Sequence, residues 1–184
     1  KEILCNNCVN LEIIEQQPEL LHLDCYGCIN LKNLSEFPKI VFLDCGNTSI
    51  SHIPYFQSLL TLYCSFSNVK IISNLNIVLL RSTDCSNLEE ISNLKKVKNI
   101  SCTGSQNIKR IIDVPMLHVL YCSGCTSLTT LDVVPKEKIR CHYTWLQYTP
   151  NYKEKINKLH HSETIKASLL FLYAMHQEML LENT

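Results

Sequence analysis

Residues Leu20 to Leu34 read LLHLDCYGCINLKNL, which has the spacing L-x-x-L-x-C-x-x-C-x-x-L-x-x-L. Taken alone, Cys25 and Cys28 with two residues between them have the spacing of one half of a zinc site. The same spacing of apolar residues, however, returns along most of the chain. The meaning of the two cysteines therefore depends on the repeat that contains them.

The first cysteine of this stretch marks a column that recurs at intervals of 18 to 20 residues. An aliphatic residue stands two positions before every member, and the column consists of Cys5, Cys25, Cys45, Cys64, Ser82, Cys102, Cys122 and Cys141. A second column, three positions further on, consists of Cys8, Cys28, Thr48, Ser67, Cys85, Ser105, Cys125 and Thr144. Self-similarity at this period predicts a solenoid in which each repeat forms one coil.

The pattern resembles the leucine-rich repeat, L-x-x-L-x-L-x-x-N/C-x-L, whose period is about 20 to 29 residues. The resemblance covers residues 1 to 144, with cysteine in place of leucine at the sixth position. The short period is similar to that of repeats in bacterial effectors, and the cysteine-rich variant is similar to leucine-rich repeat proteins of giant DNA viruses. The resemblance implies an α/β-type repeat solenoid, a horseshoe with a parallel sheet on its concave side.

Each repeat has room for a strand and an extended return. Alternate residues of L-x-x-L-x-C point to one side, so the copies are expected to stack as parallel strands about 4.8 Å apart. About ten residues remain, too few for a helix with its turns, so the convex return is expected to be extended or 3₁₀-like. An asparagine column predicts the bend out of the strand. This column consists of Asn10, Asn30, Asn68, Asn87 and Asn107.

The sequence also allows predictions about the two ends of the repeat region. The chain opens inside a repeat, so we expect a trimmed N-terminus. Beyond residue 144 the columns stop, and residues 145 to 184 are expected to form a helical cap over the last repeat. A docking helix for another domain or chain is the alternative. The apolar residues at helical spacing are Ile165, Leu169, Leu172, Tyr173, Met175, Met179 and Leu180.

The composition narrows the class of protein. The formal net charge is zero at pH 7, which gives no basic footprint for nucleic acid. The longest strongly apolar stretch, Leu169 to Met175, is far shorter than a membrane span. Eleven cysteines in a chain with few glycines and prolines suggest thiols in a reducing, intracellular compartment, the host cytoplasm if the protein is viral.

The repeat argues against special chemistry at the cysteines. A four-thiolate zinc site built from Cys5, Cys8, Cys25 and Cys28 would need all four sulfurs to converge on one ion, whereas a column spreads them one per coil. Disulfides along a column would span the strand spacing, which is slightly too long. We therefore interpret the first column as small core residues and the second as partners of turn carbonyls and amides. No catalytic residue, metal site or cofactor is predicted.

The strongest candidate site is the outward face of the predicted concave sheet. Its aromatic and apolar side chains are of the kind enriched in binding hot spots, and its charges run from acidic to basic along the stack. The predicted binding residues are His22, Asp24, Tyr26, Phe42, Asp44, Tyr63, Leu79, Arg81, Asn99, Tyr121 and Arg140.

These features predict a non-catalytic module that binds a protein partner of unknown identity through the sheet. A structural or assembly module of a larger protein, such as a viral one, is the first alternative. A thiol-based enzyme or a zinc-binding protein is the second, because the cysteine spacing permits either chemistry.

Overall fold

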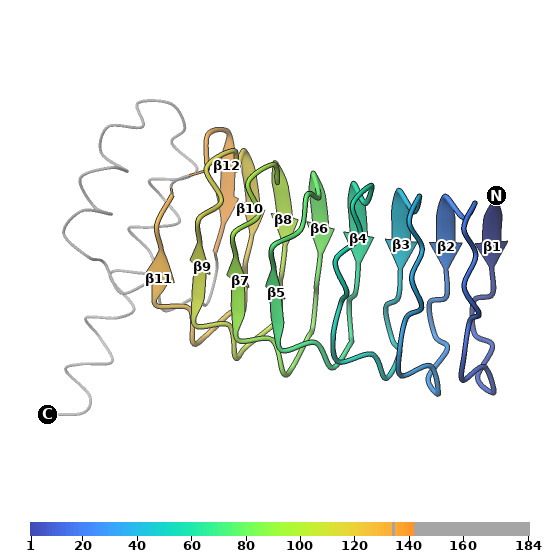
Figure 1. Ribbon diagram of the computed structural model, residues 1–184. Helices are drawn as coiled ribbons and strands as arrows, with labels where there is room; N and C mark the ends of the chain where they lie inside the picture. Colours follow the sequence, from blue (N-terminus) through green and yellow to red (C-terminus); the bar gives the residue numbers. More distant parts are fainter. Residues whose placement is uncertain (134, 142–184) are drawn as a thin grey trace, which may run out of the picture.

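The computed structural model describes residues 1–133 and 135–141, which form a parallel β-solenoid of stacked coils (Figure 1). One sheet has eight strands, and all its pairs are parallel and in register. In order, these strands are β1 (Glu2–Leu4), β2 (His22–Asp24), β3 (Phe42–Asp44), β4 (Thr61–Tyr63), β6 (Leu79–Arg81), β8 (Asn99–Ser101), β10 (Val119–Tyr121) and β12 (Lys138–Arg140). The predicted repeat solenoid with a parallel sheet is confirmed.

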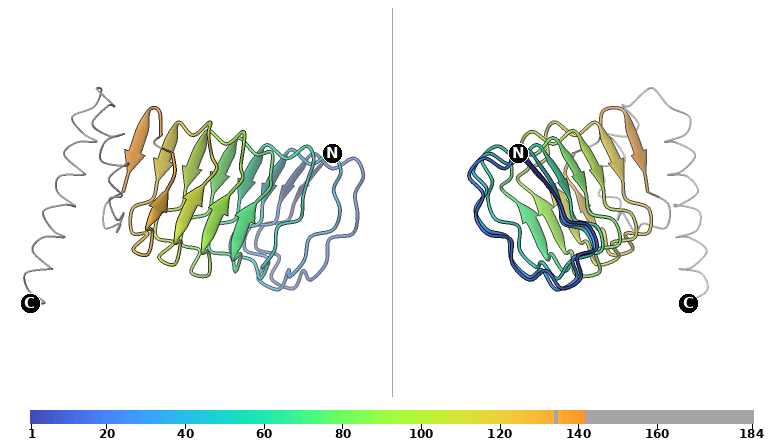
Figure 2. Two further views of the ribbon diagram at one scale, coloured as in Figure 1. Left: turned by 60° about the vertical axis from the view of Figure 1, so that its left-hand side comes forward. Right: turned by 90° about the vertical axis from the view of Figure 1, so that its right-hand side faces the viewer.

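A second parallel sheet runs along the other side of the later coils (Figure 2). Its strands are β5 (Ile71–Ser73), β7 (Glu90–Ser92), β9 (Arg110–Ile112) and β11 (Thr130–Leu131). The repeat pattern predicted extended returns here but not their pairing into a sheet. Ile71 and Ile72 favour a strand, whereas in the preceding coil Pro54 removes a backbone donor from the same region.

The helical part of the predicted fold class has no counterpart in the described residues. No helix of any kind occurs within residues 1–133 and 135–141. The predicted cap, residues 145 to 184, lies outside the described residues. The described part is therefore a β-solenoid, and its returns are extended rather than 3₁₀-helical.

One continuous core runs along the solenoid between the two sides of the coils. The central residue of each strand of the larger sheet points inward, as Leu23, Leu43 and Leu62 do, and all three are completely buried. The first cysteine column is also buried from Cys25 onward, which confirms its interpretation as a core column. Adjacent coils therefore cover each other's apolar side chains, which is the source of stability in repeat folds.

The bend out of each strand lies at a different position from the predicted one. Two residues after the first column the backbone is left-handed in every described coil turn: Asn7, Gly27, Asn47, Phe66, Asp84, Gly104 and Gly124. Glycine, asparagine and aspartate tolerate this conformation best. The predicted asparagine column instead links coils, because Asn30 donates to the Val9 carbonyl (2.8 Å) and Asn107 to the Ser86 carbonyl (2.6 Å).

Candidate binding face

All eleven predicted binding residues lie on the outward face of the eight-stranded sheet or at its margin. The strand register aligns them in two rows across the coils. One row contains His22, Phe42, Leu79 and Asn99, and the other contains Asp24, Asp44, Tyr63, Arg81, Tyr121 and Arg140. Tyr26 follows β2 at the edge of the face. Because side chains alternate along a strand, burying the central residue of each strand turns both its neighbours outward.

Rings and a guanidinium group stack continuously across β2, β3, β4 and β6. His22 stacks on Phe42 with ring centroids 4.2 Å apart, and Phe42 meets the edge of Tyr63 at 5.3 Å. The guanidinium carbon of Arg81 lies 4.7 Å from the centre of the Tyr63 ring. Each contact joins residues of neighbouring strands, so the stack fixes side chains that would otherwise be free to rotate.

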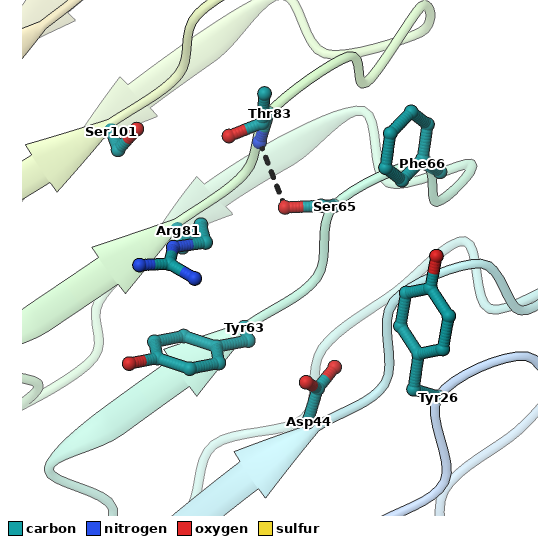
Figure 3. A pocket seen from close by; sticks show the side chains of 8 residues that line it. All are labelled: Tyr26, Asp44, Tyr63, Ser65, Phe66, Arg81, Thr83 and Ser101. Carbon is teal, nitrogen blue, oxygen red and sulfur yellow. Dashed lines mark hydrogen bonds between the residues drawn. The ribbon is translucent and has the colours of Figure 1, made fainter. Parts of the chain in front are cut away.

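Two hollows adjoin the Tyr63–Arg81 end of this stack. The first has a volume of about 430 Å³, and Figure 3 shows Arg81 above the Tyr63 ring and Asp44 between Tyr63 and Tyr26. Ser65 accepts a hydrogen bond from the Thr83 amide (3.1 Å) across its wall. Its lining residues are Tyr26, Asp44, Tyr63, Ser65, Phe66, Arg81, Thr83 and Ser101. The second hollow shares Tyr63, Arg81 and Ser101 with the first and extends to Asn99, Val119 and Tyr121. Tyr63 and Arg81 therefore stand between the two hollows.

Charge is distributed unevenly along the face, as the sequence indicated. Asp24 and Asp44 are paired on neighbouring strands β2 and β3. Toward the other end, Lys138 and Arg140 each approach the Tyr121 ring to 5.6 Å. The basic groups therefore rest on tyrosine rings and keep most of their donors available to a partner.

Asp44 is a partly buried carboxyl group of the face. Burial raises the pKa of Asp44, and the nearby charge of Asp24 adds to this effect. A hydrogen bond from the Gly46 amide (2.9 Å) and the charge of Arg81 oppose it. Burial is the largest of these effects, so the ionised carboxylate costs stability in the folded state.

The Asp44→Asn variant is expected to be more stable than the wild type at pH 7, by less than about 1 kcal/mol because the half-exposed group is screened by solvent. A carboxyl group with a raised pKa in the folded state destabilises once pH rises above its unfolded pKa. Asparagine removes that cost and can still accept the Gly46 hydrogen bond. The gain is expected to disappear at about pH 3, where the carboxyl is protonated in both states. Urea denaturation at both pH values measures it, and a loss of stability at pH 7 would contradict it.

Phe66 belongs to the face but was missed by the sequence analysis. It occupies the left-handed turn position (φ 58°), where the other described turns have glycine, asparagine or aspartate. Its side chain is 52% exposed and lines the first hollow. A bulky residue in this conformation is strained, and such strain persists where another requirement selects the side chain. The sequence does carry a signal for Phe66, because it is the one aromatic residue in a column that otherwise contains glycine, asparagine and aspartate.

The Phe66→Asn variant is expected to increase the free energy of unfolding by about 1 kcal/mol, because asparagine relieves the backbone strain. The same variant is expected to weaken partner binding, since it removes one wall of the hollow. Denaturation and binding measured on one preparation test both effects. Asn47→Phe is the reciprocal control, and it is expected to lose stability. A destabilised Phe66→Asn variant would show that Phe66 stabilises the turn by packing.

Burial makes Cys5, Cys25, Cys45 and Cys141 poor nucleophiles. Burial raises the pKa of Cys141 to about 11 and that of Cys25 and Cys45 above its ordinary value. Burial also raises the pKa of Cys5 to about 12. Among residues 1–133 and 135–141, no cluster of three or more His, Cys, Asp or Glu side chains is placed to hold a metal ion.

Comparisons with protein-family models, with curated proteins and with solved structures give no match. Within the described part of the chain, no helix has the length and apolar character needed to cross a bilayer.

Proposed function

We propose that this chain is a leucine-rich-repeat-type module that binds a protein partner on the outward, concave face of its eight-stranded sheet, without catalysis. The observation that carries the proposal is the stack of His22, Phe42, Tyr63 and Arg81, of which Tyr63 and Arg81 line two hollows. Tyrosine and arginine dominate binding hot spots, which cluster at the centre of interfaces. Mutual stacking holds these side chains in place before binding, which lowers the entropy cost of association.

The charges of the face define the partner further. A complementary surface carries basic groups over Asp24 and Asp44 and acidic groups over Arg81 and Arg140. Such complementarity fixes the orientation of the partner and accelerates its association. Arg81 lies against both hollows, so an acidic side chain of the partner would meet its guanidinium while an apolar one contacts Leu79 or Val119.

Affinity capture from host-cell extract tests this proposal. The wild type, the Tyr63→Ala/Arg81→Glu double variant and a Lys32→Glu control are compared. Lys32 is exposed and lies in the return segment after the β2 turn, away from the strands of the face. Proteins captured by the wild type and the control but lost from the double variant support the proposal. Equal capture by all three contradicts it.

We also infer a reducing, intracellular compartment for the protein. The inference is supported by eleven cysteines that are all free thiols, nine of them buried in the described coils. In an oxidising compartment so many thiols would be exposed to oxidation during folding.

A structural or assembly role in a larger protein is the second candidate, and one observation favours it. The first coil exposes Leu4 (65%), Val9 (47%) and Ile13 (71%). Exposed apolar groups gathered in one coil are typical of a contact surface. Under this alternative the protein self-associates, and Ile13→Glu shifts it toward monomer in sedimentation velocity. A wild-type protein that is monomeric at all concentrations would contradict self-association through the first coil.

A further inference from the structure

Cysteines of neighbouring coils meet in pairs at three places in the solenoid. In each pair a first-column cysteine of one coil lies against the second-column cysteine of the next. The Cys28 thiol donates to the Cys5 carbonyl (3.0 Å), Cys85 to Cys64 (3.1 Å) and Cys125 to Cys102 (3.0 Å). These contacts join residues 21 to 23 positions apart, so the spacing C-x-x-C within a repeat does not reveal them.

In the Cys102–Cys125 pair the sulfur atoms themselves are close. Cys125 Sγ lies 3.8 Å from Cys102 Sγ, whereas a disulfide bond is about 2.05 Å long. The bond can therefore form if the sulfurs approach by a little under 2 Å, a distance within reach of side-chain rotation and small backbone shifts. The Cys5–Cys28 and Cys64–Cys85 pairs share with Cys102–Cys125 the bond from the thiol to the partner's carbonyl.

The other coil boundaries provide internal controls. Their equivalent positions hold at least one hydroxyl group: Cys25 with Thr48, Cys45 with Ser67, and Ser82 with Ser105. The Ser105 hydroxyl donates to the Ser82 carbonyl (2.7 Å), as the cysteine of each pair does. The fold therefore accepts a hydroxyl group in this contact at position 105, whereas the Thr48 hydroxyl donates to the Cys45 carbonyl of its own coil (2.7 Å).

We propose that Cys5–Cys28, Cys64–Cys85 and Cys102–Cys125 are disulfide-forming modification sites that link adjacent coils when the protein meets a low-molecular-weight disulfide such as oxidised glutathione. One cysteine, as thiolate, attacks the donor disulfide and releases one donor thiol. Its partner, as thiolate, then attacks the mixed disulfide and releases the second. The protein loses two electrons and two protons for each bond, and the donor disulfide is reduced to two thiols.

One member of each pair must supply the thiolate. In the central pair, polar contacts with Cys64 and Ser67 lower the pKa of Cys85, while that of Cys64 is raised. Cys85 is therefore the member of this pair that gives up its proton more readily. Both thiols are buried, so the donor reaches them when the turn at Phe66, which is strained, opens.

Mapping of disulfides in the folded full chain tests the proposal. The protein is treated with oxidised glutathione without denaturant, the remaining thiols are then alkylated in denaturant, and linked peptides are identified by mass spectrometry. The expected links are 5–28, 64–85 and 102–125, each lowering the mass by about 2 Da, with Cys25, Cys45 and Cys141 alkylated. Links within repeats, such as 5–8, 25–28 or 122–125, would overturn the proposal, as would eleven alkylated thiols after prolonged treatment.

Two variants sharpen the test. Cys125→Ser is expected to remove only the 102–125 link and leave Cys102 alkylated, because the fold already accepts serine at position 105. Ser82→Cys/Ser105→Cys is expected to add a fourth link, 82–105, whereas Ser105→Cys alone adds none. Absence of the fourth link in a double variant with wild-type circular dichroism would overturn the geometric basis of the proposal.

Discussion

The Leu62→Ala variant is expected to have a free energy of unfolding about 3 kcal/mol lower than that of the wild type. Leu62 is the central residue of β4, is completely buried, and lies in register between Leu43 and Leu80. Its truncation leaves a cavity at the interface of three coils, which the neighbouring backbones cannot close without breaking strand pairs. Urea denaturation followed by circular dichroism measures the effect.

Leu60→Ala is the matched control, since Leu60 is only two residues away but 45% exposed. Its expected cost is less than about 1 kcal/mol. The difference between the two variants tests the inward register of the repeat. Equal costs, or a larger cost for Leu60→Ala, would show that the apolar columns have been assigned to the wrong side of the coil.

The second large effect is expected in binding. With purified partner, Arg81→Glu is expected to weaken affinity at least about 30-fold, which corresponds to about 2 kcal/mol. The substitution removes a group shared by both hollows, unstacks Tyr63 and adds a negative charge to the hollow that Asp44 lines. Tyr63→Ala is expected to have a comparable effect. Both variants are expected to stay within about 1 kcal/mol of the wild type in stability, because the two side chains lie outside the core.

Calorimetry at two salt concentrations separates the electrostatic part of this effect. The wild-type affinity is expected to fall with added salt and that of Arg81→Glu to change less, because exposed charges are screened. Lys32→Glu makes the same charge reversal away from the face and is expected to bind normally. Equal loss of affinity in Lys32→Glu would indicate that net charge, rather than the stacked arginine, governs binding.

The repeat columns predicted the main sheet and its outward face because burial imposes a strict period. A solenoid must hide the same positions in every coil, so Leu23, Leu43 and Leu62 were assigned inward and their neighbours outward from spacing alone. The positions of Tyr63 and Arg81 on the face followed from that assignment. Their stacking did not, because it depends on rotamers and on the distance between coils.

Other features depend on contacts between coils, which a single repeat does not encode. The strands of the second sheet form only where successive returns pair, so Ile71–Ser73 gave no signal beyond an apolar run. The left-handed turn at Phe66 was not predicted, because the bend was assigned to the asparagine column. Asparagines of that column instead form hydrogen bonds to the neighbouring coil. The contact between Cys102 and Cys125 was not predicted, because it joins two coils. The C-x-x-C spacing within one repeat relates Cys125 to Cys122 instead.

Site-specific photo-crosslinking tests the central claim most directly. A benzophenone amino acid replaces Leu79 on the face in one variant and Ile71 on β5, which is 49% exposed, in the other. Partner binding through the eight-stranded sheet predicts crosslinks from position 79, their loss in the Arg81→Glu background, and none from position 71. Crosslinks from position 71 with none from position 79 would contradict the account.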